Sequence, residues 1–131
     1  MDKKVFIIED DVNIMSSLRA KFGLEGYKTE GDIGNGSIEE ILMNVKMFSP
    51  DFIILDMILP NVDGFEIARE LKSREETKNI PIFAFTNLSD KDSKSRGISM
   101  GVDYYLIKKD LSYDEFIEKV KKILNNKEKV K

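Results

Sequence analysis

The chain contains no cysteine, no histidine and no tryptophan, and only 3 of its 131 residues are proline. Without cysteine and histidine there can be no disulfide, zinc finger, thiol nucleophile, Ser-His-Asp triad or phosphohistidine in this chain. Any bound metal must then be a hard cation held by carboxylates, carbonyls and water. Mg²⁺ is the cation we expect, or Mn²⁺ in its place.

Positive charge is not in excess either. The chain has 21 Lys and Arg against 24 Asp and Glu, a net charge of −3, which disfavours non-specific binding to DNA. No stretch reaches the ~18 consecutive apolar residues of a membrane span. The apolar run at residues 5–8 is too short for the core of a signal peptide. We therefore expect a cytoplasmic protein without direct contacts to nucleic acid or membrane.

Length and composition predict one ordered domain. A chain of 131 residues with 41% hydrophobic residues can bury a core of its own, but has no room for a second module of ordinary size. We place this domain at residues 1–125. Residues 126–131 are expected to form a short Lys-rich tail at the fraying end of a helix.

Short apolar runs alternate with segments of helical spacing along the chain. Strands covered on both faces are predicted at residues 5–8, 52–55, 82–85 and 104–107, with a marginal edge strand at 27–30. Helices are predicted at 12–22, 38–45, 65–71, 89–100 and 112–124, the last opened by a Ser112–Glu115 capping box. This order predicts a three-layer, doubly wound (βα)5 α/β fold, with a parallel five-stranded sheet in the order 2-1-3-4-5.

Polar residues stand where four of these strands end: Glu9, Asp10, Asp56, Thr86 and Lys108. Ligands in such folds bind beyond the carboxyl ends of the strands. Each residue alone has an ordinary structural explanation, such as a helix cap, a strand-forming threonine or a solvated lysine. Their joint placement on strands that the topology brings together favours a common site. Asp11, directly before a helical pattern, is interpreted as a helix N-cap.

The chemistry that suits this set is phosphoryl transfer to a carboxylate. A divalent cation relieves the repulsion between close carboxylates. An ionised aspartate is itself a nucleophile, so no histidine base is needed. The cation, the Lys108 ammonium and the Thr86 hydroxyl can each face one equatorial oxygen of the transferred group.

From residue 5 to about residue 124, the sequence resembles the receiver domain of two-component response regulators. Thr86 lies 30 residues after Asp56, and Lys108 lies 22 after Thr86, the usual receiver spacing. The segments that carry the resemblance are Ile8-Glu9-Asp10-Asp11, the loop from Asp56 to Gly64, and the run from Gly101 to Lys108. The family implies phosphorylation of Asp56, Mg²⁺ held by Glu9, Asp10, Asp56 and the Ile58 carbonyl, a Thr86–Tyr105 switch pair, and contact of Lys108 with the phosphate.

The sequence departs from the family pattern at three places. Lys109 stands where receivers usually have proline, which predicts a trans Lys108–Lys109 bond and an altered loop, because a cis bond before a non-proline residue costs ~2.5–4 kcal/mol. Asn87 replaces a small residue and is expected to narrow access for small phosphodonors. Ile58 and Leu88 stand where many receivers have polar side chains that position water, which predicts a long-lived phosphoryl group.

The resemblance implies a signalling module rather than an enzyme, beyond self-phosphotransfer and slow autodephosphorylation. Its expected partners are a sensor histidine kinase or a phosphotransfer protein, and an unidentified downstream protein that binds the face formed by helix 4, strand 5 and helix 5. The chain is expected to be a monomer or a phosphorylation-dependent homodimer.

Three alternatives to the receiver each lack support at particular residues. A receiver-like interaction module that is no longer phosphorylated is opposed by the complete set of acidic, hydroxyl and lysine residues. A phosphohydrolase of the haloacid dehalogenase type would need a second aspartate at position 58, which is isoleucine. A flavodoxin-like cofactor binder shares the topology but needs a phosphate-cradling loop, and residues 34–36 are too short for one.

Overall fold

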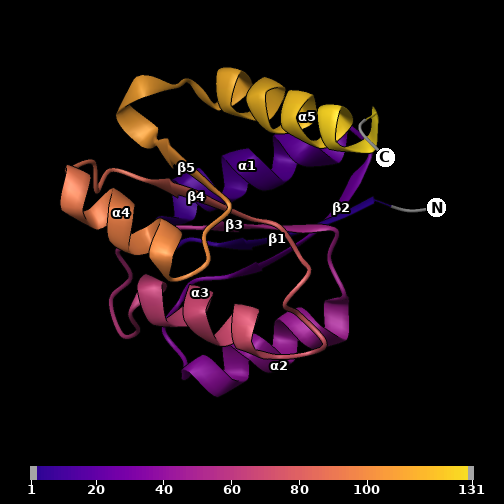
Figure 1. The fold of residues 1–131 in the computed structure, drawn as a ribbon. Coiled ribbons are helices and arrows are strands. Elements are labelled where there is room, and N and C mark those ends of the chain that lie inside the picture. Colours follow the sequence, from indigo (N-terminus) through magenta and orange to yellow (C-terminus); the bar gives the residue numbers. More distant parts are fainter. Residues whose placement is uncertain (1–2, 130–131) are drawn as a thin grey trace.

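The computed structural model describes residues 3–129, with side chains as far as residue 126. Its centre is a sheet of five parallel strands in the order β2-β1-β3-β4-β5 (Figure 1). The strands are β1 (Lys3–Ile8), β2 (Tyr27–Asp32), β3 (Phe52–Leu55), β4 (Ile82–Thr86) and β5 (Tyr104–Ile107). The predicted fold class and strand order are confirmed.

Burial explains why the central strands read as unbroken apolar runs. All residues of β3 and β4 are buried, because helices cover both faces of the sheet. At the edge, β2 is longer than predicted and pairs with β1 from Tyr27 to Asp32. Because its side chains are polar and partly exposed, β2 does not form an unbroken apolar run, and its last two residues were not predicted as strand. The Arg19 guanidinium donates to the Thr29 carbonyl (3.3 Å) and hydroxyl (3.1 Å), which satisfies part of this open edge.

Five α-helices connect and flank the strands. They are α1 (Val12–Leu24), α2 (Ile38–Phe48), α3 (Gly64–Ser73), α4 (Lys91–Ser99) and α5 (Tyr113–Lys129). Side-chain caps begin the first four, from Asp11, Ser37, Asp63 and Asp90. The predicted roles of Asp11 as a cap and of Ser112 and Glu115 as a reciprocal capping box are confirmed by their hydrogen bonds.

The helix bounds differ from the prediction by one to five residues, except at the starts of α1 and α2. Two of these differences concern α4 and α5. Helix α4 begins at Lys91 instead of residue 89, because Asp90 caps it by accepting from the Ser93 amide at 3.0 Å. Helix α5 runs to Lys129 instead of ending at residue 124, so residues 126–129 of the expected tail continue the helix. Residues 130 and 131 lie outside the described part of the chain. The boundary of the domain at residue 125 stays a prediction.

The sheet separates two hydrophobic clusters. On one face, α1 and α5 contribute Leu18, Phe22 and Phe116 among others, packed on side chains of β1, β3 and β4. On the other face, α2 and α3 contribute Ile41, Leu71 and their neighbours. Figure 1 shows these two helix pairs on opposite sides of the sheet. The two cores hold the carboxyl ends of β1, β3, β4 and β5 at fixed positions, which is what the site requires.

Helix α4 is the least embedded of the helices. Its buried residue is Gly97, where an added Cβ would lie 2.8 Å from the Tyr105 ring. Arg96 stacks over the Phe65 ring at 4.1 Å and pairs with Asp63 at 3.3 Å. A polar helix held by a few contacts is the kind of element that moves at low cost.

No helix among residues 3–129 is long and apolar enough to cross a bilayer. The described backbone contains no cis peptide bond, which confirms the trans bond predicted between Lys108 and Lys109. Residues Lys108–Asp110 form a 3₁₀ turn that the sequence did not indicate.

Gly64 offers a test of how tightly α3 is fixed to the end of β3. A Cβ at this position would lie 2.6 Å from the Met57 Cα and 2.8 Å from the Asp56 carbonyl oxygen, and neither backbone atom can move freely. We expect Gly64→Ala to lower the free energy of unfolding by about 2 kcal/mol in urea denaturation.

Gly23→Ala is the matched control. A Cβ at Gly23, also in a helix, would meet no atom within 4 Å. This variant is expected to stabilise the protein by about 0.5 kcal/mol, because alanine is the better helix former. Equal effects of the two substitutions would contradict the close approach of α3 to the Asp56–Met57 backbone.

Candidate functional site

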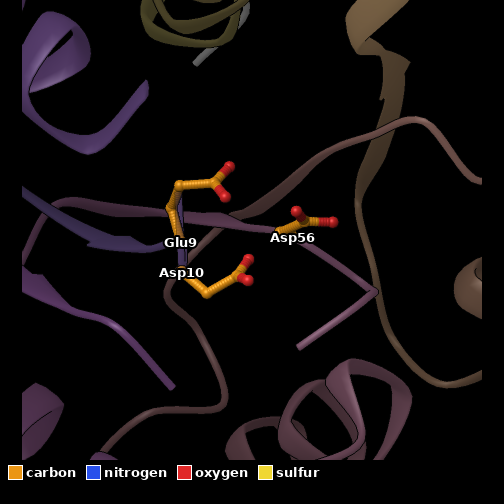
Figure 2. Close-up of side chains that lie close together, drawn as sticks. All are labelled: Glu9, Asp10 and Asp56. Atoms are coloured by element: carbon orange, nitrogen blue, oxygen red, sulfur yellow. The ribbon is translucent and has the colours of Figure 1, made fainter. Parts of the chain in front are cut away.

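Three carboxylates meet at the carboxyl ends of β1 and β3. Ile8 pairs with Leu55 across the sheet, so the next residues, Glu9 and Asp56, leave their strands side by side. Glu9 is 2% exposed and Asp56 is 5% exposed, whereas Asp10 is exposed to solvent. One oxygen from each of the three lies within 4.8 Å of the others, and Figure 2 shows the three side chains close together at the strand ends.

Lys108 supplies the positive charge of the site from the end of β5. Its ammonium lies 2.7 Å from a Glu9 oxygen and 2.7 Å from a carboxylate oxygen of Asp56. The lysine side chain is only 12% exposed. Burial alone would lower the pKa of Lys108, but its hydrogen bonds and charge interactions with Asp56 and Glu9 outweigh burial and raise that pKa. The ammonium is therefore held charged between the two carboxylates.

The site remains short of positive charge. Burial, with the nearby charge of Asp56, raises the pKa of Glu9 to about 7, although hydrogen bonds from Lys108 and the Asp11 amide act in the opposite direction. One ammonium thus does not balance three clustered carboxylates. Oxygen ligands grouped in this way suit a hard divalent cation, and Glu9, Asp10 and Asp56 could hold one.

The loop after Asp56 is closed on itself. The Ile58 amide donates to an Asp56 carboxylate oxygen at 3.1 Å, and Ile58 forms an antiparallel bridge with Asp63. Asp63 then caps α3 by accepting from the Phe65 amide at 2.9 Å. The Ile58 side chain is 54% exposed at the mouth of the site. One side of Asp56 therefore faces the backbone of this loop and the other faces Lys108.

Thr86 and Tyr105 are linked through the backbone of Leu88. Thr86 is fully buried at the end of β4, and its hydroxyl accepts a hydrogen bond from the Leu88 amide at 3.3 Å. The hydroxyl of the buried Tyr105 donates to the Leu88 carbonyl at 2.7 Å. Burial, followed by the charges of Asp90 and Asp56, raises the pKa of Tyr105 to about 12, so its hydroxyl stays a donor at neutral pH.

The structure brings together the residues that the sequence singled out. Glu9, Asp10, Asp56 and Lys108 form the charged cluster, and Thr86 and Tyr105 lie on the neighbouring strands β4 and β5. The roles assigned to them remain predictions. Sequence reasoning missed the Leu88 backbone as the group that Thr86 and Tyr105 share. No spacing signals such a contact, because it depends on the path of a loop.

Sequence reasoning also missed two contacts of the loop that follows Asp56. These are the Arg96–Asp63 pair and a hydrogen bond from the Asn61 amide group to the Asn35 carbonyl at 2.9 Å. Both join segments that are more than twenty residues apart. Neither contact can be predicted from residue spacing or periodicity in the sequence.

Comparison with known proteins identifies the class that this fold and site define. The model of the response regulator receiver domain matches residues 5–121, and the chain belongs to this family. The polar-differentiation response regulator DivK of Brucella ovis is 35% identical over 126 residues, which cover 96% of this chain and 99% of DivK. The chain is thus similar in extent to a receiver that stands alone.

Longer relatives and solved structures agree with this assignment. The phosphate regulon transcriptional regulatory protein PhoB of Rhizobium meliloti is 33% identical over 121 residues, and the chain spans about half of its length, 52%. A CheY-like receiver domain protein from Methanospirillum hungatei has the same fold, with a TM-score of 0.85 at 21% identity and full coverage of both chains.

Neutralising Glu9 is expected to stabilise the metal-free protein. Because the folded-state pKa of Glu9 is raised from 4.5 to about 7, this group costs stability that grows as pH rises from about 4.5 to about 7. In EDTA at pH 8, Glu9→Gln should raise the free energy of unfolding by on the order of 2 kcal/mol. At pH 5 most of this gain should be absent.

Glu30→Gln serves as the control, since Glu30 is an exposed carboxylate on β2. The substitution removes a carboxylate away from the site, so it should not reproduce the gain in the free energy of unfolding at pH 8. A loss of stability in Glu9→Gln at pH 8 would show that Lys108 needs both carboxylates, and would contradict the charge imbalance inferred for the site.

Proposed function

We propose that this receiver accepts a phosphoryl group on Asp56 from a sensor histidine kinase or a phosphotransfer protein. The observation that carries the proposal is the position of Asp56, buried beside Glu9 and bonded to both Lys108 and the Ile58 amide. In the transfer, a carboxylate oxygen of Asp56 attacks phosphorus and the P–N bond of the donor phosphohistidine breaks. The other ring nitrogen of the donor carries a proton, so the imidazole leaves neutral with the bonding electron pair. An ionised carboxylate needs no general base for this step.

Each charged group has a defined part in the proposed transfer. Mg²⁺, or Mn²⁺ in its place, would be held by Glu9, Asp10, Asp56 and the Ile58 carbonyl, and would neutralise charge on the phosphoryl oxygens. Lys108 already lies 2.7 Å from Asp56 and would pass its hydrogen bond to the incoming phosphoryl group. The Lys108 ammonium, together with the cation when it is bound, would stabilise the charge that spreads over the equatorial oxygens in the transition state.

The signal would leave the site through Thr86 and Tyr105. Turning the Thr86 hydroxyl toward a phosphoryl oxygen would release the Leu88 amide, which it now binds. The Tyr105 hydroxyl donates to the Leu88 carbonyl. A movement of the loop that contains Leu88 would therefore move the tyrosine ring as well. The ring packs under Gly97 of α4, and the face of α4, β5 and α5 would read out the change to a downstream protein.

The proposal also covers the location, oligomeric state and chemistry of the domain. The domain of residues 1–125 would work in the cytoplasm, as a monomer or as a homodimer formed on phosphorylation. Its chemistry would be confined to self-phosphotransfer and slow autodephosphorylation. No direct role at nucleic acid or membrane is proposed for it.

Asp56→Asn tests the phosphoacceptor directly. The amide is nearly isosteric with the carboxylate but is not a nucleophile at phosphorus, so labelling by a radioactive phosphohistidine donor with Mg²⁺ should be abolished. Asp51→Asn is the matched control, because Asp51 precedes the same strand at its opposite end. Undiminished labelling of Asp56→Asn would refute the assignment. Absence of both labelling and beryllofluoride binding in the unchanged protein would favour an interaction module that works without phosphorylation.

Ile58→Asn tests the expected long life of the phosphoryl group. The Ile58 side chain is 54% exposed two residues after Asp56, and an apolar group there cannot orient a hydrolytic water. Asparagine should shorten the half-life of the phosphorylated protein severalfold. Ile98→Asn is a matched control, since Ile98 is equally exposed but lies on α4. A half-life of seconds that neither Ile58→Asn nor a polar substitution of Leu88 changes would overturn this expectation.

A further inference from the structure

Two loops that are distant in sequence lie against each other beside the site. The acceptor loop (residues 57–63) joins β3 to α3, and the brace loop (residues 33–37) joins β2 to α2. The Asn61 side-chain amide donates to the Asn35 carbonyl at 2.9 Å. Next to it, the Leu59 side chain packs over Gly34, where an added Cβ would lie 3.0 Å from a Leu59 methyl carbon.

The acceptor loop needs an external support at its tip. Met57 is buried and Leu59 and Val62 pack against the core, whereas Ile58, Pro60, Asn61 and Asp63 are exposed, so the polar tip is the part of the loop least fixed by burial. Its own bonds, the Ile58 amide to Asp56 and the Ile58–Asp63 bridge, close the base of the loop but do not reach the tip. The Asn61–Asn35 hydrogen bond is made at the tip and joins it to another part of the chain.

The brace loop is itself well held. The Asp32 carboxylate accepts from the Gly34 amide at 2.8 Å and from the Asn44 side chain at 3.4 Å, so one residue ties the loop to the end of β2 and to α2. Gly34 has φ +74°, a left-handed conformation that glycine adopts without strain. A loop fixed in this way can act as a support for its neighbour.

We propose that Asn61 is a positioning residue, whose hydrogen bond to the brace loop keeps the Ile58 carbonyl in place for the divalent cation. The inference rests on the proposed function, which makes that carbonyl a ligand. Only two residues separate Ile58 from Asn61. Motion of the backbone at the tip of the loop would therefore also displace the Ile58 carbonyl. Groups outside the ligand set that orient a ligand commonly change metal affinity when they are replaced.

The test compares Asn61→Ala with Asn61→Gln, which keeps a donor, and with Asn125→Ala, an exposed asparagine on α5. The dissociation constant for Mg²⁺ alone is measured by NMR titration, and hydrogen exchange of backbone amides is measured without Mg²⁺. We expect Asn61→Ala to weaken Mg²⁺ binding about tenfold and to speed exchange of the Ile58 amide. Asn61→Gln should recover part of the affinity, and Asn125→Ala should match the unchanged protein.

The outcomes separate this inference from the proposed function. If the unchanged protein binds Mg²⁺ and Asn61→Ala binds it with an affinity that differs by less than about twofold, the role of Asn61 is overturned. The proposed cation site would then stand. Faster exchange throughout the chain would also overturn it, since that marks a general loss of stability. Failure of the unchanged protein to bind Mg²⁺ would refute the proposed cation site and the inference with it.

Discussion

The pair of ion contacts made by Lys108 is the interaction on which the site depends. Its ammonium lies 2.7 Å from both Glu9 and Asp56 and allows two carboxylates to be buried side by side. A buried carboxylate without a partner would be too costly to keep charged. Because one lysine does not satisfy three carboxylates, the site retains an affinity for further positive charge. The contact is possible because β1, β3, β4 and β5 are successive parallel strands, whose carboxyl ends lie on the same side of the sheet.

A second constraint joins this charged cluster to the surface of the protein. Thr86 and Tyr105 do not touch through a bond of their own but hold the amide and the carbonyl of the same residue, Leu88. The Tyr105 ring in turn packs against Gly97, where an added Cβ would lie 2.8 Å from the ring. The proposed change at Asp56 would reach α4 through residues 87–90, which join β4 to α4. The few contacts of α4 make it the element that would respond most readily.

Sequence patterns were sufficient for the sheet, the strand ends and the charged residues. Unbroken apolar runs predicted β3 and β4 because both faces of these strands are buried. The polar residues at their carboxyl ends indicated where the site lies. The same reasoning underestimated β2, whose exposed face alternates, and stopped α5 too early, since its last turns are polar. Contacts made by loops, such as Asn61 with Asn35, depend on backbone paths that neither periodicity nor spacing encodes.

The carboxylate of Asp56 is the proposed acceptor of the phosphoryl group. Borohydride reduces an aspartyl phosphate to homoserine, which mass spectrometry of peptides can locate. After treatment with a phosphohistidine donor and Mg²⁺, the account predicts homoserine at position 56 and at no other aspartate. Homoserine at position 10 or 11, or a phosphoryl group that survives on a hydroxyl residue, would contradict it.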